Sequence, residues 1–184
     1  VLNYAIKTLS GMPLTDNAKE YEKKIVFHAT AYFTTSPGDL KGGEFVLQLA
    51  RKLPDVEFYV AGTPYVHEQL PSNIHLLGCI SNQNALADYY AMADVSLIVS
   101  KRETFSMPVA ESLCCGTPIV GFKAGGPESI CPESMKANFC KFGDVDSLAD
   151  ILNSQSSISD LNDCTQYYSK KLMTDLYLKV YEEL

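Results

Sequence analysis

The chain has 184 residues, with 22 acidic and 15 basic side chains, a net charge of −7, and 46% hydrophobic and 20% charged residues. This composition is ordinary for one globular domain and excludes a disordered tail, a collagen-like repeat and a coiled coil. The acidic balance argues against duplex nucleic acid as a partner, and the sequence lacks the run of about 18 apolar residues that a transmembrane segment requires.

Short β-type runs alternate with helical patterns along the chain. Residues 1–20 are irregular and predict a linker. Strands are predicted over 24–31, 56–61 (stopped by Gly62), 73–77, 94–99, 117–122 and, more weakly, 137–142. Helices are predicted over 42–53, from an N-cap at Ser81 to about 93, over 107–115 with a stop at Gly116, over 144–152 and over 164–184, with a loop at 151–163.

Two segments carry most of this prediction. In 42–53, apolar residues fall at helical spacing at Val46, Leu49, Ala50 and Leu53. Residues 94–99 form a nearly continuous apolar run, which is typical of a strand buried on both faces of a parallel sheet. The alternation therefore predicts the α/β class, a doubly wound, Rossmann-like parallel sheet with helices on both faces.

The six cysteines, at 79, 114, 115, 131, 140 and 164, include no C-x-x-C pair. None of the three histidines lies near a cysteine pair at metal-ligand spacing, so a zinc site is not favoured. The N-terminus has neither a basic start nor a long apolar run, so we expect no secretion signal. Free thiols in a reducing compartment are favoured, which predicts a cytoplasmic protein.

Three loops at the predicted carboxyl edge of the sheet, where such folds bind ligands, carry unusual residues. The first, 34–43, is long and ends in Lys41, whose ammonium and the N–H groups of Gly42 and Gly43 suit an anion. A solvated lysine beside a flexible turn explains the same residues equally well. The third, 124–128, has Gly125 and Gly126, which permit close approach of a ligand or simply a turn into a short helix.

The second loop, 100–111, leads from a buried strand into a helix. Pro108 marks the first turn, where the N–H groups of Ser106 and Met107 form an anion site reinforced by the helix dipole. Glu103 lies just before it, and a carboxylate beside an anion site suits sugar hydroxyls. Glu111 lies one turn into the helix on an otherwise apolar face. On spacing alone, an exposed glutamate and a dipole-stabilised one remain an equal alternative.

Residues 103–111 read E-T-F-S-M-P-V-A-E and continue as S-L-C-C-G-T-P-I-V-G-F-K-A-G-G-P-E-S-I over 112–130. This stretch resembles the E-x7-E motif and its continuation, EAMACGTPVV…GGxPEVI, in the C-terminal half of family 4 glycosyltransferases. These are retaining enzymes with the two-domain GT-B fold. The K-G-G at 41–43, the V-A-G at 60–62 and the H-L-L-G at 75–78 also fall in the family's order, so the resemblance covers nearly the whole chain.

The resemblance implies a role for each matching residue in binding a nucleotide-diphosphate sugar. Lys41, with Gly42 beside it, would bind the diphosphate together with the backbone N–H groups of Ser106 and Met107. The family uses no metal and no other cofactor, so these groups would stabilise the departing diphosphate.

The sugar and the nucleoside would be held by four further residues. Glu103, the expected catalytic residue, would contact hydroxyls of the donor sugar. Glu111 would hydrogen-bond the ribose, and Cys79 and Ile80 would border the base.

The resemblance also implies a domain organisation. Residues 1–20 would be an interdomain linker and 21–184 the nucleotide-sugar-binding domain with its C-terminal helix, with an N-terminal acceptor domain missing. The missing initiator methionine fits a fragment that binds donor but transfers no sugar alone. The full-length enzyme would transfer a hexose to a saccharide or lipid-linked acceptor, in the cytoplasm or peripheral to the membrane.

The sequence departs from the family at two places. The family usually has an arginine five or six residues before the lysine, where Thr35 and Ser36 stand, so one cation is missing unless Lys101 or Arg102 turns inward. The family often has glycine where Ser106 stands. Two alternative classes stay open: a receiver-like or flavodoxin-like binding or signalling module, and a sugar epimerase or phosphorylase of the same architecture.

Overall fold

The structure, a computed structural model, describes residues 23–154 and 168–182. The predicted linker at 1–20, most of the predicted loop at 151–163 and the first part of the predicted helix 164–184 lie outside these residues. None of the helices within the described ranges combines the length and apolar character needed to span a bilayer.

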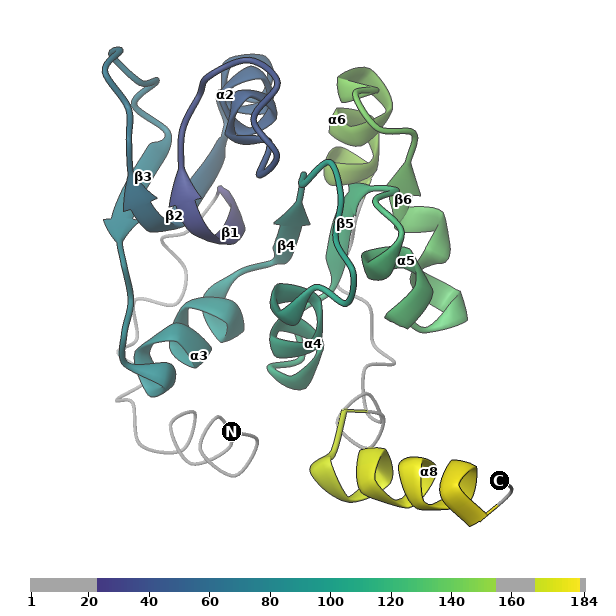
Figure 1. Cartoon of the computed structure of the whole chain (residues 1–184). Helices are drawn as coiled ribbons and strands as arrows, with labels where there is room; N and C mark the ends of the chain where they lie inside the picture. Colours follow the sequence, from purple (N-terminus) through teal and green to yellow (C-terminus); the bar gives the residue numbers. More distant parts are fainter. Residues whose placement is uncertain (1–22, 155–167, 183–184) are drawn as a thin grey trace.

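The core of the fold is a parallel sheet of six strands in the order β3-β2-β1-β4-β5-β6, as Figure 1 shows. The strands are β1 (Lys24–Phe33), β2 (Val56–Pro64), β3 (Ile74–Gly78), β4 (Val95–Ile98), β5 (Ile119–Phe122) and β6 (Phe139–Cys140). Every neighbouring pair is parallel. This order is that of a doubly wound Rossmann-like sheet, so the predicted fold class is confirmed.

Helices cover both faces of the sheet. They are α2 (Gly43–Lys52), α3 (Gln83–Met92), α4 (Met107–Cys114), α5 (Gly126–Ile130), the 3₁₀ helix η1 (Glu133–Asn138), α6 (Val145–Ser154) and α8 (Lys170–Glu182). In Figure 1, α2 and α6 lie together at one side and α3 and α4 together at the other, in line with their contacts.

Successive side chains of β1 point to opposite faces of the sheet, as strand geometry requires, and pack in different parts of the core. Val26 packs in a cluster with residues of α2 and α6, such as Val46 and Leu148. Phe27, on the opposite face, packs edge-on against the ring of Tyr90 from α3. A third cluster fills the space between β5, α4 and η1.

The structure corrects several predicted boundaries. β2 does not stop at Gly62, because its pairing with β1 resumes after a bulge and continues to Pro64. The N-cap of α3 is Asn82 rather than Ser81, because the Asn82 side chain accepts the N–H groups at 84 and 85. The weak strand 137–142 is only the two-residue β6 after a 3₁₀ turn, and α6 runs to Ser154 in the predicted loop.

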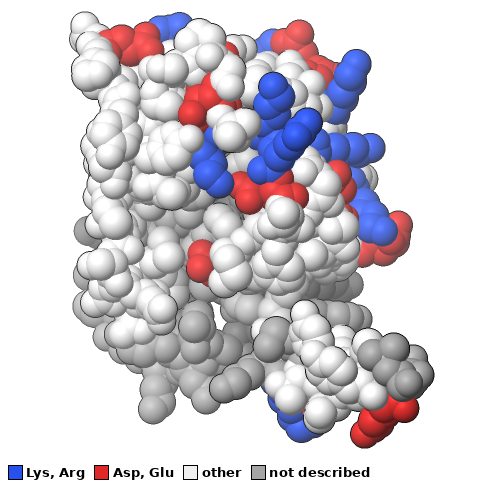
Figure 2. Space-filling model, viewed as in Figure 1, with Lys and Arg blue, Asp and Glu red and all other residues white. Residues whose placement is uncertain are grey.

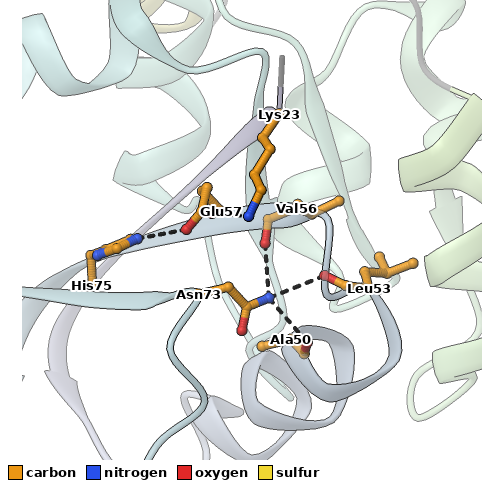
Figure 3. A network of polar contacts seen from close by, with 7 residues as sticks. All are labelled: Lys23, Ala50, Leu53, Val56, Glu57, Asn73 and His75. Atoms are coloured by element: carbon orange, nitrogen blue, oxygen red, sulfur yellow. Dashed lines mark hydrogen bonds and ion pairs between the residues drawn. The ribbon is translucent and has the colours of Figure 1, made fainter. Parts of the chain in front are cut away.

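A buried amide ties three elements together at the amino edge of the sheet, opposite the edge expected to bind ligands. Figure 3 shows Asn73 donating from Nδ2 to the carbonyl oxygens of Ala50 (3.1 Å), Leu53 (3.1 Å) and Val56 (2.8 Å). Nearby, Glu57 pairs with Lys23 and His75, at 2.8 and 2.7 Å. Asn73 therefore satisfies carbonyls at the end of α2 that the helix itself leaves without donors.

Candidate functional site

The strand order reverses between β1 and β4, and such a switch point is where doubly wound sheets bind ligands. Here the two strands pair only at Val26↔Val95 and Phe27↔Ser96, and then separate. His28 spans the opening with its side chain, because its Nδ1 lies 2.9 Å from the Leu97 carbonyl oxygen. The separation leaves room for a cavity at the carboxyl edge.

A cavity of about 460 Å³ occupies this position, within the ordinary size range of small-molecule sites. Seven of the eight predicted site residues line it: Lys41, Cys79, Ile80, Glu103, Ser106, Met107 and Glu111. Figure 2 shows basic and acidic side chains next to each other around a hollow on this face. The structure thus brings together residues from the loops after β1, β3 and β4.

Lys41 and Glu103 form an ion pair across the cavity. Their Nζ and Oε1 atoms are 2.9 Å apart, although the residues are 62 positions apart in sequence. Both side chains are largely shielded, with 33% and 18% of their surfaces exposed. The site therefore holds a cation and a carboxylate that already act on each other.

Gly42 is the predicted site residue that does not line the cavity. Its N–H donates to the Asp39 carbonyl at 3.3 Å, and it is buried. A Cβ on Gly42 would lie 2.1 Å from the Val99 carbonyl oxygen, and one on Gly43 would lie 2.2 Å from that of Thr34. The two glycines therefore let α2 approach the sheet closely, and in this way they fix the position of Lys41.

The start of α4 faces the cavity through Ser106 and Met107. Ser106 is the N-cap, is buried, and has a φ of 69°, the left-handed region that favours glycine. As N-cap and first helical residue, Ser106 and Met107 have N–H groups without intrahelical acceptors, and the helix dipole adds partial positive charge there. This end of α4 is suited to an anion.

Glu111, one turn further along α4, is held by a buried tyrosine. The Tyr90 hydroxyl donates to Glu111 Oε2 at 3.1 Å, and Tyr90 itself is only 1% exposed. Burial, then the charge of Glu111, raises the pKa of Tyr90 well above its usual range. The tyrosine therefore stays a donor at every ordinary pH and orients the carboxylate.

The third predicted loop does not line the cavity and instead supports the second loop. Gly126 opens the short helix α5, which is the alternative that the sequence left open. The Glu103 N–H donates to the Ala124 carbonyl (3.1 Å), and the Gly126 N–H donates back to the Glu103 carbonyl (2.9 Å). The Glu128 carboxylate accepts the N–H groups of Ala124 and Gly125, which fixes this turn. Glu103 is held in place by these bonds.

Sequence reasoning missed the residues at the end of β1, chiefly His28 and Thr30, and Gly62 on β2. The prediction placed His28 and Thr30 within a strand and Gly62 at the end of the next one, and it gave none of the three a role in the site. His28 is 3% exposed, and its Nε2 has no hydrogen-bond partner among the described residues. Burial lowers the pKa of His28, with a further contribution from Lys41, so its ring is neutral.

Two other expectations concern a replacement for the family's arginine and a metal ion. Lys101 and Arg102 do not line the cavity, so they do not supply the cation that the family's arginine would provide. Within residues 23–154 and 168–182, no group of three or more His, Cys, Asp or Glu side chains could hold a metal ion.

The switch-point cavity places the chain in the class of nucleotide-binding α/β domains, because it offers an anion site and carboxylates for hydroxyl groups in one place. Residues 38–172 match the family Glycosyl transferases group 1. This match covers well over half of the chain, and the chain belongs to this family. The receiver-like or flavodoxin-like alternative is therefore wrong.

Relatives and solved structures agree with this assignment. A stretch of 85 residues, 45% of the chain, is 29% identical to the N-acetyl-alpha-D-glucosaminyl L-malate synthase of Bacillus anthracis and covers 22% of it. Another of 80 residues, 43% of the chain, is 38% identical to the MMP alpha-(1->4)-mannosyltransferase of Mycolicibacterium hassiacum and covers 19% of it. All of the chain superposes on 55% of Anabaena HepE in complex with UDP-glucose, with a TM-score of 0.70 and 17% identity, which shows a shared fold. The chain thus spans about half of that structure and less of these relatives.

Proposed function

We propose that this chain is the donor-binding, C-terminal domain of a family 4 retaining glycosyltransferase with the two-domain GT-B architecture. The observation that carries the proposal is the single cavity in which Lys41, the start of α4, Glu103 and Glu111 meet. The E-x7-E spacing of the two glutamates and the half-length superposition on HepE with UDP-glucose support it. Residues 1–20 would then link to an acceptor domain that precedes this one.

The donor is a nucleoside diphosphate sugar, bound with its diphosphate between Lys41 and the N–H groups of Ser106 and Met107. A cation and a helix N-terminus are both suited to that charge. Glu111, oriented by Tyr90, accepts hydrogen bonds from the ribose, and Cys79 and Ile80 border the base.

The chemistry asked of this domain is electrostatic. As the bond between the sugar and the diphosphate breaks, negative charge grows on the leaving phosphate oxygens, and Lys41 and the start of α4 stabilise it without a metal. Glu103, released from Lys41, accepts hydrogen bonds from the sugar hydroxyls and holds the sugar for attack by the acceptor. Transfer itself requires the second domain, so we expect this chain alone to bind donor without transferring sugar.

A thermal-shift experiment tests the proposal with uridine, guanosine and adenosine diphosphates and their sugar conjugates. One nucleotide at a hundredfold excess over its Kd should stabilise the fold by about 2.7 kcal/mol, which raises the Tm by about 5–10 °C in a domain of this size. Lys41→Ala should remove most of this shift. Lys136→Ala, which breaks only the exposed pair with Glu133, is the matched control and should retain it.

Thiol alkylation offers a second readout at the expected base site. Cys79 is exposed and lines the cavity, whereas Cys131 is buried and Cys114, Cys115 and Cys140 are partly covered. The nucleotide that raises the Tm should slow alkylation of Cys79, located by mass spectrometry. Absence of any Tm shift with all three bases, together with unchanged alkylation, would refute donor binding.

A further inference from the structure

His28 has one ring nitrogen with a hydrogen-bond partner and one without. A carbonyl oxygen can only accept, so the contact of 2.9 Å with Leu97 places the hydrogen of the neutral ring on Nδ1. Nε2 then carries a lone pair and no hydrogen, and it has no partner among residues 23–154 and 168–182. Buried polar atoms are nearly always hydrogen-bonded, and His28 is buried yet lines the cavity. This indicates that the partner of Nε2 arrives with a ligand.

The other charged groups of the cavity leave a bound diphosphate short of positive charge. Besides His28, the titratable side chains that line it are Lys41, Cys79, Glu103 and Glu111. Lys41 is the one cation among the described lining residues, and it is paired with Glu103. The neighbours of His28 on β2 and β4, Val60 and Leu97, are apolar. A diphosphate bound at Lys41 therefore adds negative charge to a site with one cation and two carboxylates, and histidine is the side chain that can balance it near neutral pH.

Lys41 connects His28 to the diphosphate electrostatically. Burial, with a further contribution from the charge of Lys41, lowers the pKa of the imidazole, so the two side chains are close enough to act on each other. A diphosphate at Lys41 cancels that contribution and brings negative charge near the ring, which favours the imidazolium form. In this form both nitrogens are donors, so Nδ1 keeps its bond to Leu97 and Nε2 gains a hydrogen that a phosphate oxygen accepts.

We infer that His28 takes up a proton from solvent when a nucleotide sugar binds, and that the protonated Nε2 donates a hydrogen bond to a phosphate oxygen. This inference rests on the proposed function and gives the diphosphate a second positively charged donor beside Lys41. The proton returns to solvent when the nucleotide leaves. Affinity for the donor should therefore rise as the pH falls, because binding consumes a proton.

Calorimetric titration of this chain with UDP-glucose, GDP-mannose and ADP-glucose tests the inference. A nucleotide sugar is the suitable probe, because its diphosphate has no group that titrates near pH 7. The change of binding enthalpy with the ionisation enthalpy of the buffer gives the number of protons taken up. At pH 7 the nucleotide sugar that binds should bring about 0.5–1 proton with it, and its Kd should fall by up to about tenfold per unit as the pH is lowered from 8 to 6.

A second measurement needs no variant. In nitrogen-15-labelled protein, the imidazole nitrogens of His28 should change from the Nδ1–H form to the imidazolium form when the same nucleotide sugar is added at pH 7. A ring that only supports the fold would keep its form. A His28 ring that stays neutral at saturation would overturn the inference.

In the calorimetric experiment, His28→Gln should lose the proton uptake and the pH dependence of the Kd. The matched control is His67→Gln, at an exposed position that does not line the cavity, and it should retain both. Binding without proton uptake by the parent would refute this inference alone. Uptake that persists in His28→Gln would also refute it and would assign the proton to Glu103 or Glu111. If none of the three nucleotide sugars binds, the proposed function fails and this inference fails with it.

Discussion

Replacing Asn73 by alanine is expected to destabilise the fold by about 2–4 kcal/mol. The amide has two N–H groups, which three carbonyl oxygens share within 3.1 Å, and the residue is 6% exposed. The variant loses two buried hydrogen bonds of about 1 kcal/mol each and leaves the Ala50 carbonyl without a side-chain donor, a further cost of about 1–2 kcal/mol, whereas the Leu53 carbonyl keeps the N–H of Val56.

Asn73→Asp distinguishes hydrogen bonding from packing, because it keeps the shape of the side chain. At pH 7 a carboxylate would face three carbonyl oxygens, so this variant should be less stable than Asn73→Ala. It should regain stability as the pH falls and the carboxyl group becomes protonated, since a protonated carboxyl has one O–H donor.

Urea unfolding followed by circular dichroism measures both changes. The midpoint should fall while the m-value stays constant, because the unfolded surface is the same. Asn84→Ala, at an exposed position of α3, is the control and should stay within about 0.5 kcal/mol of the parent. If Asn73→Ala also stays within that limit, the amide does not stabilise the end of α2 and the reasoning is wrong.

Three further variants test residues at the cavity. Ser106→Gly removes the strain of a left-handed serine, and should stabilise the fold by about 1 kcal/mol and raise the Tm by about 2–4 °C. Tyr90→Phe removes the donor to Glu111, and should weaken a ribonucleoside diphosphate about fivefold while leaving the 2′-deoxy analogue unchanged. His28→Gln should remove a pH dependence: because burial lowers the pKa of His28, the unfolded chain binds the proton first, and stability falls as the pH drops below about 6.5, by up to about 1.4 kcal/mol per pH unit.

For each of these variants, one outcome would contradict the prediction. A lower Tm for Ser106→Gly would mean that the serine side chain stabilises the fold by more than the left-handed backbone at this position destabilises it. Equal weakening of the ribo- and deoxyribonucleotide in Tyr90→Phe would point to general damage rather than to a positioned carboxylate. If His28→Gln and the parent lose stability in parallel between pH 7.5 and 5.5, measured by urea unfolding, His28 is not the titrating group.

The strand and helix pattern predicted the sheet, because each buried strand is bounded by a glycine or by a polar turn. It did not predict where β2 ends, since a bulge in β1 lets pairing resume past Gly62. The prediction chose Ser81 as N-cap, but serine and asparagine cap helices about equally well, and the backbone places the last extended residue at Asn82.

Most of the site followed from the motif around Glu103 and Glu111, but the contacts within it did not. The Lys41–Glu103 pair joins residues from different crossovers, and only the folded sheet brings their Nζ and Oε1 atoms within 2.9 Å. Gly42 matched the motif, yet its N–H is turned toward Asp39, because backbone direction is set by the approach of α2 to the sheet. His28 stands in an unremarkable strand, and its place follows from the separation of β1 from β4.

The ion pair between Lys41 and Glu103 has a consequence for how the two halves of a donor act on each other. A diphosphate that draws Lys41 away deprives Glu103 of its counter-ion, and the sugar hydroxyls then become its best partners. Under the proposed roles of Lys41 and Glu103, binding of the phosphates and binding of the sugar would be linked, each favouring the other. A nucleoside diphosphate without its sugar would leave the Glu103 carboxylate without a partner. The nucleotide sugar should therefore bind more tightly than the nucleoside diphosphate product and displace it. In this way the Lys41–Glu103 pair would assist turnover.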